Sequence, residues 1–232
     1  MGLAQSEDPT LLPNGFRRAL GLGAGDIPER TPVKLGEDGL QAFRYKDLKP
    51  AGFDRTMTVY ASPTSKGVLT VACMAQPTDA KAFQPGCEEI ADTLSLSSGD
   101  PYPVGPDPAY AKTLSETFGA LAKRVTAERK ALTADGATPR AQAAASRRIA
   151  RGYSAAAATL ADTPVSPADK RLNDALVARL RAAAAAWRDA AAAARAKDKD
   201  GFRAAGAEIK KAEDALDATV ARLKAAGYKV QT

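Results

Sequence analysis

The chain has no histidine among its 232 residues and only two cysteines, Cys73 and Cys87. Without histidine, the usual general base, the commonest zinc ligand and the Ser-His and Cys-His nucleophile pairs are missing. Two cysteines far from CxxC spacing also argue against a zinc site or a thioredoxin-type redox pair. We therefore expect no enzymatic activity, no metal site and no cofactor.

Long hydrophobic runs are absent as well. No segment approaches the roughly 18 consecutive apolar residues that span a bilayer, and the N-terminus lacks a basic stretch followed by an apolar one. We expect neither a transmembrane segment nor a signal peptide within this sequence. Two interpretations stay open, a cytoplasmic protein and a protein whose membrane anchor lies outside this sequence.

Charge is unevenly distributed along the chain. Residues 1–106 carry 10 Lys+Arg and 13 Asp+Glu, a net charge of −3, whereas residues 107–232 carry 23 and 14, a net charge of +9. The second half is therefore the part that would attract an anionic partner.

A cluster of prolines divides the chain near residue 100. The stretch "SSGDPYPVGPDP" can form neither a helix nor an inner strand. We predict an α+β module over residues 1–100, a Pro/Gly linker over 101–107 and a four-helix bundle module over 108–232.

The first module has the pattern of two β-hairpins. "PVKLGEDGLQAFRY" predicts one hairpin around Asp38-Gly39, and "RTMTVYASPTSKGVLTVACMA" predicts another whose loop runs from Ser62 to Gly67. The stretch from Val68 to Ala75 is apolar on both faces, which indicates the central strand of a small antiparallel sheet.

A helix is predicted after this strand, with Phe83, Cys87, Ile90 and Leu94 along its buried face. On the strand, Cys73 shares a face with Leu69 and Val71 because side chains alternate. If the helix packs on that face, a disulfide between Cys73 and Cys87 is feasible and indicates an oxidising compartment. The alternative is two buried free thiols, which are common in cytoplasmic proteins.

The second module contains four segments with helical periodicity, which predict an antiparallel bundle of long Ala-rich helices. Ser166, Pro167 and Asp169 form a strong helix-start signal, and Gly227 is a suitable C-terminal cap. The expected buried positions are Ala111, Leu114, Phe118, Leu121, Val125 and Leu132, with Glu128 in the remaining slot of that seam; Ile149, Tyr153, Ala156 and Leu160; Leu172, Leu176, Leu180, Ala183, Trp187, Ala190 and Ala194; and Phe202, Ala205, Ile209, Ala212, Leu216, Val220 and Leu223.

Arginines of the two middle helices are the candidate binding residues. They would attract phosphate, anionic lipid or a cell-wall polymer, and the alternative is a solvated surface that reflects an Ala/Arg-rich composition. Nucleic acid is not expected, because aromatic residues are not interleaved with the basic ones. Trp187 has two interpretations, a core anchor or a ligand contact. The candidate anion-binding residues are Arg147, Arg148, Arg151, Arg179, Arg181, Arg188 and Arg195.

Two other stretches have the residue types of a site but not its context. "GLGAGD", residues 21–26, is glycine-rich, but no strand precedes it and no GK[ST] follows, so we interpret it as a linker. Glu88 and Asp92 lie one helical turn apart, yet nothing nearby completes an oxygen shell for a cation. We interpret these carboxylates as a solvated helix face.

Several stretches of the chain resemble a known group of proteins. "LGEDGLQAFRYKDLKP", "TVYASPTSKGVLTVAC", "CEEIADTLSL" and "PRAQAAASRRIARGYSAAAATL" are similar to the extracytoplasmic region of membrane-anchored actinobacterial proteins, including the tails of receptor-type Ser/Thr kinases and related uncharacterised proteins. The first module also resembles small Mog1/PsbP-like antiparallel-sheet domains. No HRD or DFG kinase motif occurs in the sequence.

The resemblance implies a sensor, scaffold or interaction region outside the membrane, with Cys73 and Cys87 paired. Our leading hypothesis is a non-catalytic extracytoplasmic module that binds a small-molecule ligand or a protein partner, on the extracellular or cell-envelope side. The competing hypothesis is a basic helical adaptor that binds anionic lipid, a cell-wall polymer or another polyanion.

Overall fold

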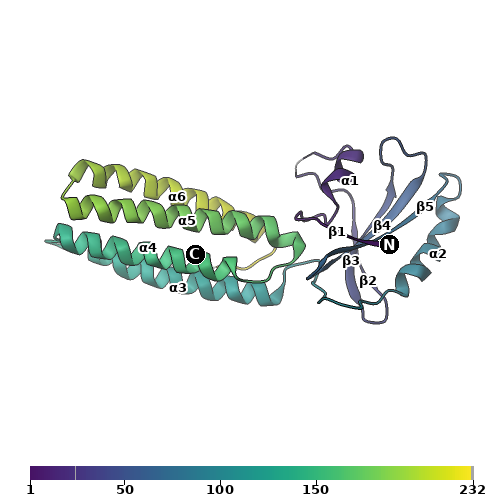
Figure 1. The fold of residues 1–232 in the computed structure, drawn as a ribbon, viewed down its shortest axis with the longest axis horizontal. Coiled ribbons are helices and arrows are strands. Elements are labelled where there is room, and N and C mark those ends of the chain that lie inside the picture. The colour runs from purple at the N-terminus through teal and green to yellow at the C-terminus, as the bar shows by residue number, and fades with distance from the viewer. Residues whose placement is uncertain (24, 231–232) are drawn as a thin grey trace. The chain divides into compact units, whose positions relative to one another are not determined.

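The computed structural model describes residues 1–23 and 25–230, which form two compact units. The first unit comprises residues 1–107 together with 164–171, and the second comprises residues 108–163 and 172–230 of the described chain. A five-stranded antiparallel sheet dominates the first unit, and four long packed helices make up the second (Figure 1). The fold class expected from the sequence is therefore confirmed.

The sheet has the strand order β1-β5-β4-β3-β2, and every neighbouring pair is antiparallel. Both expected hairpins form, β2 with β3 and β4 with β5. The strands are β1 (Gly2–Ala4), β2 (Thr31–Leu35), β3 (Leu40–Leu48), β4 (Thr56–Thr64) and β5 (Gly67–Ala75).

The second hairpin has a shorter loop than predicted, because Ser62 and Pro63 continue strand β4 and pair with Leu69 and Val68. Proline, which has no backbone N–H, fits at position 63 because the pairing of β4 with β3 ends at Ala61. The Pro63 carbonyl accepts the Tyr102 N–H. The prediction that Val68–Ala75 is the central strand was also wrong. Strand β4 occupies the centre and is buried along almost its whole length.

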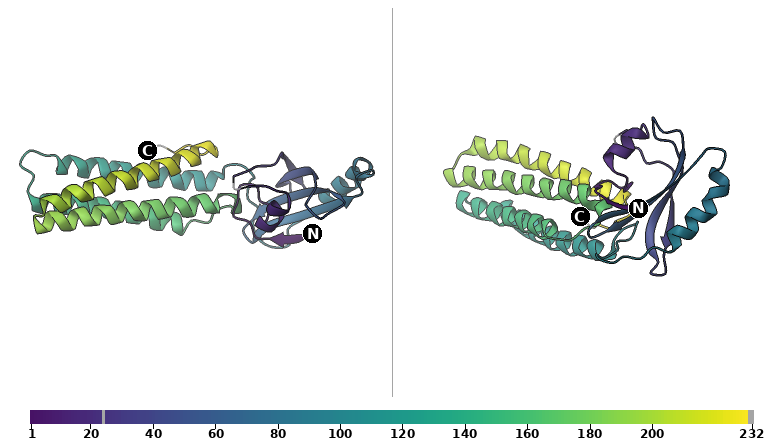
Figure 2. Two further views of the ribbon diagram at one scale, coloured as in Figure 1. Left: turned by 90° about the horizontal axis from the view of Figure 1, so that it is seen from above. Right: turned by 45° about the vertical axis from the view of Figure 1, so that its right-hand side comes forward.

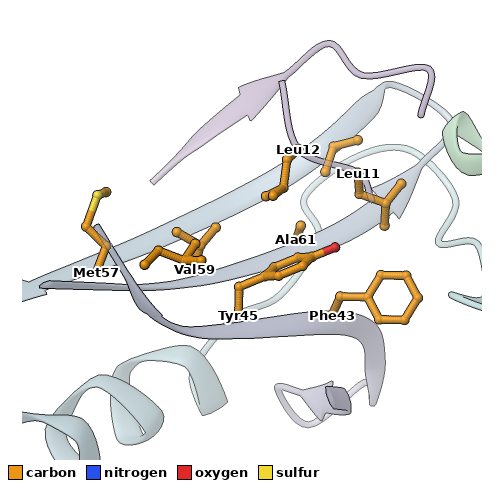
Figure 3. Packing of buried hydrophobic residues seen from close by; sticks show 9 residues of the cluster. Leu11, Leu12, Phe43, Tyr45, Met57, Val59 and Ala61 are labelled. Atoms are coloured by element: carbon orange, nitrogen blue, oxygen red, sulfur yellow. The ribbon is translucent and has the colours of Figure 1, made fainter. Parts of the chain in front are cut away.

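Apolar residues cover both faces of this sheet. On one face, Leu11 and Leu12 of the N-terminal segment pack on Tyr45 and Val59 (Figure 3), close to helix α1 (Asn14–Ala19). On the other face, helix α2 (Ala80–Asp92) covers a second cluster that includes Tyr60. Neighbouring residues of one strand contribute to opposite clusters because strand side chains alternate. Burial on both faces explains why β4 lacks a clear polar side.

Helix α2 presents a different stripe to the sheet than the one predicted. Cys87, Ala91 and Leu94 are buried, but Phe83 and Ile90 are 45% and 58% exposed. The helix is rotated about its axis so that the Glu88 side chain reaches Arg44 on β3. Cys87 lies on the predicted stripe, so the disulfide agrees with that pattern. The ion pair with Arg44 is the contact that a purely apolar pattern does not contain.

The four helices of the second unit run antiparallel and side by side in all views (Figures 1 and 2). Ser166 starts α5 as predicted, and Thr138 and Asp198 cap α4 and α6 by accepting backbone N–H groups. None of the helices in the described part of the chain combines the length and apolarity needed to cross a bilayer. The helices are α3 (Pro108–Leu132), α4 (Pro139–Ala161), α5 (Pro167–Ala196) and α6 (Lys199–Ala225).

Most expected seam positions of the helices are buried. All four positions of α4 are confirmed, as are Leu176, Leu180 and Trp187 of α5. On α3, Val125 and Leu132 are only partly buried, while Tyr110 is buried and was not predicted. The Tyr110 hydroxyl donates to Asn173 Oδ1, so its polar end finds a partner inside the unit.

A buried ion pair organises the N-terminal segment. Arg17 donates to Asp8 at 2.7 Å, and both side chains are at most 10% exposed. The same guanidinium donates to the carbonyls of Gly23 and Asp26. These bonds fold back the glycine-rich stretch interpreted as a linker, of which Ala24 lies outside the described residues. Its carbonyls thus bind a cation of the protein, which differs from a phosphate cradle built from N–H groups.

Replacing Arg17 by methionine should lower the local free energy of unfolding by about 3–5 kcal/mol, because Asp8 would remain buried without its countercharge. Hydrogen exchange of β3 and β4 peptides, followed by mass spectrometry, measures this loss. Arg18, which is exposed, provides the matched control, and Arg18→Met should change stability by less than about 0.5 kcal/mol. Equal effects of the two substitutions would contradict a role for the buried pair.

Candidate functional site

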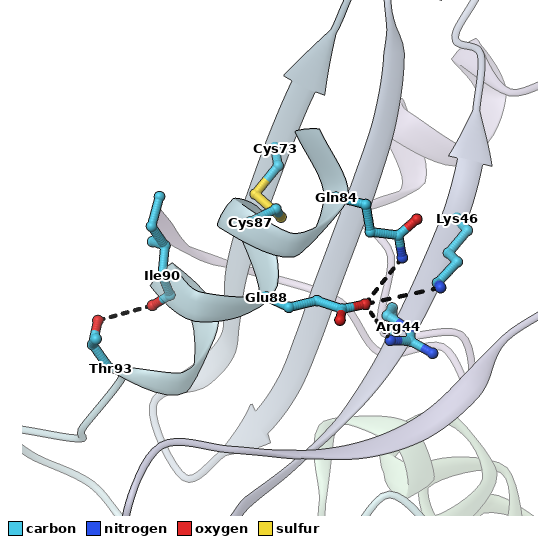
Figure 4. The surroundings of a disulfide bond; sticks show 8 residues. All are labelled: Arg44, Lys46, Cys73, Gln84, Cys87, Glu88, Ile90 and Thr93. Atoms are coloured by element: carbon cyan, nitrogen blue, oxygen red, sulfur yellow. Dashed lines mark hydrogen bonds and ion pairs between the residues drawn. A yellow bond between two sulfur atoms is a disulfide. The ribbon is translucent and has the colours of Figure 1, made fainter. Parts of the chain in front are cut away.

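A disulfide joins helix α2 to the sheet. Cys73 on β5 and Cys87 on α2 are bonded at 2.02 Å, with 6.0 Å between their Cα atoms (Figure 4). The pairing predicted from the sequence is confirmed, and the alternative of two free thiols is wrong. Cys87 is fully buried, so the bond lies against the hydrophobic core. Such a bond is consistent with an oxidising compartment.

One carboxylate of α2, Glu88, contacts the sheet, so the interpretation of a solvated face is wrong for this residue, whereas Asp92 is exposed. Glu88 accepts from Arg44 at 2.7 Å and from Gln84 at 3.0 Å, and Lys46 lies 3.9 Å away (Figure 4). Two cations from β3 therefore hold one face of the helix on the sheet. Across the described ranges, no three acidic or cysteine side chains are grouped in a way that could hold a metal ion.

Three of the seven predicted arginines converge at one place in the helical unit. Arg147 of α4 and Arg188 and Arg195 of α5 line a groove of about 480 Å³, together with Ala191, Ala192 and Ala196. We call this feature the basic groove. The alanine methyl groups leave its floor low, and no carboxylate lines it.

The other four predicted arginines lie outside the basic groove. Arg148 donates to Glu128 of α3 at 2.6 Å, which neutralises its charge locally. Arg179 lines a separate groove between α5 and α6 that also contains Asp189, Glu208 and Lys211. Arg151 and Arg181 are exposed and are not among the residues that line the basic groove. The structure thus concentrates three of the seven predicted residues in one site.

The sequence of α4 strengthens the positive potential at this site. Residues 139–161 contain four arginines and no aspartate or glutamate. On α5, Asp189 is the one acidic residue after Asp174, and it lines the other groove. Because neighbouring charges of one sign add, positive charge is concentrated at the basic groove.

A second cluster brings together one side chain from each of the four helices. Glu213 of α6 accepts from the Tyr153 hydroxyl of α4 at 2.9 Å and from the Trp187 indole N–H of α5 at 3.2 Å. Its other oxygen pairs with Arg129 of α3 at 2.5 Å, and this guanidinium lies 5.8 Å from the centre of the Trp187 ring. We call these four residues the Glu213 cluster.

The Glu213 cluster was missed in the sequence because its members are far apart along the chain. Trp187 is buried as a core anchor, and its indole N–H binds within the protein. One signal was present, since Glu213 follows the seam position Ala212 and precedes Leu216. A carboxylate at the margin of an apolar seam needs hydrogen-bond donors, but the sequence does not show which residues supply them.

The surroundings of Tyr153 in the Glu213 cluster raise the pKa of its side chain. Burial raises the pKa of its phenol above the usual value of 10.0, and the negative charge of the neighbouring Glu213 raises it further. The phenol therefore stays protonated and donates to Glu213 throughout the physiological range. Three members of the cluster, Arg129, Tyr153 and Glu213, line a groove of about 250 Å³. Apolar residues that include Phe118, Val125 and Leu216 complete its lining.

Removing the disulfide should destabilise the first unit. Replacing both cysteines by alanine reopens a loop with a sequence separation of 14, which corresponds to a loss of about 3 kcal/mol in the chain-entropy model. Hydrogen exchange of α2 and β5 peptides gives the measurement, and reduced wild-type protein should show the same loss. Unchanged exchange in both samples would show that the bond does not stabilise this unit.

The stability of the helical unit should fall above pH 10. The folded state holds the Tyr153 proton more tightly than the unfolded chain, so stability is complete below pH 10.0 and is lost as the pH rises toward the raised folded pKa. Tyr153→Phe removes this contribution, so the difference in unfolding free energy between wild type and variant should shrink above pH 10. Urea titrations from about pH 8 to pH 11, followed by fluorescence of the single tryptophan, test this. A constant difference would refute it.

No protein-family model, curated protein or solved structure gives a significant match to this chain. No relative therefore assigns a role to any of its residues. The disulfide, the basic groove and the Glu213 cluster are the features on which a function can be built.

Proposed function

We propose that this chain is a non-catalytic interaction module that acts on the extracytoplasmic side of a membrane and binds a ligand or protein partner. The observation that carries the proposal is the disulfide between β5 and α2. Disulfides persist in secreted and cell-envelope proteins, whereas cytoplasmic thiols are kept reduced.

The location of the bond supports a structural role for it. Cys87 lies in the same buried cluster as Ala91 and Leu94, beneath the helix that covers one face of the sheet. Reactive disulfides are usually strained or exposed, and reactive thiols lie in electropositive, accessible surroundings. A bond with a buried end is suited to holding α2 in place for the lifetime of the protein.

The polar side chains of the chain support a binding role more than a catalytic one. Nucleophile and base pairs that depend on histidine are unavailable, since the sequence has none. Ser65 in the "SPTSK" stretch accepts the Asp100 N–H in a loop, and Glu213 is occupied by three donors. The hydrogen-bonding capacity of these groups is thus used within the protein, whereas a general base needs a free acceptor for the proton of its substrate.

The resemblance to extracytoplasmic regions of membrane-anchored actinobacterial proteins agrees with this proposal. Such regions are sensors or scaffolds, and the catalytic part of a receptor kinase lies elsewhere in the chain. By this proposal the helical unit supplies the binding surface.

A basic helical adaptor is the second candidate function, and the basic groove favours it. Arg147, Arg188 and Arg195 face one groove without an acidic neighbour in its lining. An anionic lipid surface, a cell-wall polymer or another polyanion would meet this charge. The two candidates are compatible, because an extracytoplasmic module can have a polyanion as its ligand.

The thiol state of the protein in its native cells tests the leading proposal. Intact cells are treated with an alkylating reagent that blocks free thiols, and the protein is then purified and digested without reductant. We expect unmodified Cys73 and Cys87 in one disulfide-linked peptide pair, because the bond forms in an oxidising compartment. A second sample reduced before alkylation serves as the control. Two alkylated cysteines in the unreduced sample would reject the extracytoplasmic assignment.

A further inference from the structure

We propose that the basic groove between α4 and α5 binds a linear polymer that carries repeated phosphate groups. This inference rests on the proposed function, because it names the ligand class of the binding module. The groove is lined by Arg147, Arg188 and Arg195 and by three alanines.

The first argument is the chemistry of the side chains. Guanidinium groups stay charged at all physiological pH values and present paired N–H donors that match the oxygens of a phosphate. All three arginines are exposed, and within residues 1–23 and 25–230 no carboxylate forms an ion pair with any of them. By contrast, Arg129 and Arg148 of the same unit are paired with glutamates. The groove therefore keeps its charge available for a ligand.

The second argument is the spacing of the charges. Arg188 and Arg195 are seven residues apart on one face of α5, which corresponds to about 10 Å along the helix. Arg147 faces the same groove from α4. Arg181 lies a further seven residues before Arg188 and extends the row along the helix face. A single small anion would use one end of this row, whereas a chain of phosphates can follow its length.

The third argument is the form of the groove floor. Ala191 is buried, and Ala192 and Ala196 lie beside it in the lining, so only methyl groups rise between the arginines. The groove has a volume of about 480 Å³. Larger residues at these positions would fill the groove and push a ligand away from the guanidiniums.

A lipid bilayer fits this surface less well. Proteins that bind membranes through a helix insert exposed apolar side chains beside the basic ones. In the described part of the chain, the large exposed hydrophobic residues all precede residue 91, outside the four long helices. The basic groove therefore has charge but no apolar residues to insert.

Nucleic acid also fits less well, because single strands bind through stacking on exposed aromatic rings. In the helical unit, Phe118, Tyr153 and Trp187 are buried, and so are Tyr110 and Tyr228, while Phe202 is partly buried. The groove can therefore bind phosphate groups through charge, but it offers no exposed aromatic ring on which a base could stack.

Fluorescence anisotropy with labelled inorganic polyphosphate tests the proposal on the full chain. Replacing Arg147, Arg188 and Arg195 by glutamine should weaken binding by at least about tenfold. The slope of log K against log salt concentration should also become less steep by about two. The matched control replaces Arg18, Arg55 and Arg222 by glutamine; these three arginines are exposed, lie outside the groove and have no ion pair within the described residues, so the same charge is removed. We expect this control to bind within about threefold of the wild type. Helical circular dichroism verifies that both variants are folded.

Two results would overturn the proposal. Equal loss in both triple variants would show that net charge attracts the polymer without a site, and unchanged binding in the groove variant would place the site elsewhere. Vesicles of phosphatidylglycerol and a single-stranded oligonucleotide are measured as competitors. If either displaces polyphosphate at a lower phosphate concentration than unlabelled polyphosphate does, the ligand class is wrong.

Failure of this inference is distinguishable from failure of the proposed function. Loss of polyphosphate binding leaves the thiol result in native cells unaffected, and the module would then bind another partner. Free thiols in native cells would reject the compartment while the groove measurements remained valid.

Discussion

The bond between Cys73 and Cys87 is the constraint on which the first unit depends. Helix α2 has a narrow buried stripe, and its proline at position 85 removes a backbone donor from its middle. An isolated helix of 13 residues is marginal in water. The covalent bond keeps it on the sheet, and the ion pair between Glu88 and Arg44 sets its rotation. The resulting cover buries Tyr60 and allows β4 to be apolar on both sides.

The helical unit is stabilised by close packing of alanines and by the Glu213 cluster, without a covalent bond. Alanine dominates the buried positions of α4 and α5, for example Ala145, Ala183 and Ala190. Alanine loses no side-chain entropy in a helix and lets two backbones approach closely, but each buried methyl contributes little apolar area. Rows of identical alanines do not fix the position of one helix along its neighbour, and the Glu213 cluster does. Its bonds require one residue from each helix, so a shift of any helix along its neighbour would leave a buried polar group without a partner.

The alanine-rich seams also create the surface that we propose to be functional. Where alanines reach the outside of α5, they form a low floor between long arginine side chains. The same residues that allow close packing inside the unit therefore leave an open groove on it. The groove between α5 and α6 has a similar floor, but its mixed charges, from Asp189 and Glu208 to Lys211, cancel one another. The identity of the flanking charges makes one groove a candidate site and the other an ordinary surface.

Local patterns in the sequence were sufficient for the two hairpins, the four long helices and the covalent pairing, whereas strand β1 was not predicted. Alternation placed Cys73 on the covered face of its strand, and helical spacing placed Cys87 on the buried side of its helix, so proximity followed from a single packing step. The caps at Ser166 and Gly227 and the buried residues of α4 were likewise local. The errors at Phe83, at Ile90 and in the choice of central strand arose where two elements adjust to each other. A periodic pattern does not contain the rotation of a helix or the order of strands.

The sequence by itself determined the two hairpins, the four long helices, the disulfide partners and the excess of positive charge, because these depend on residues close together in the chain or on composition. Only the tertiary structure decided which arginines share a groove and which are neutralised. It also assembled Arg129, Tyr153, Trp187 and Glu213 around one carboxylate. Both outcomes depend on the rotation and axial offset of each helix, and packing of whole helices against one another sets these quantities.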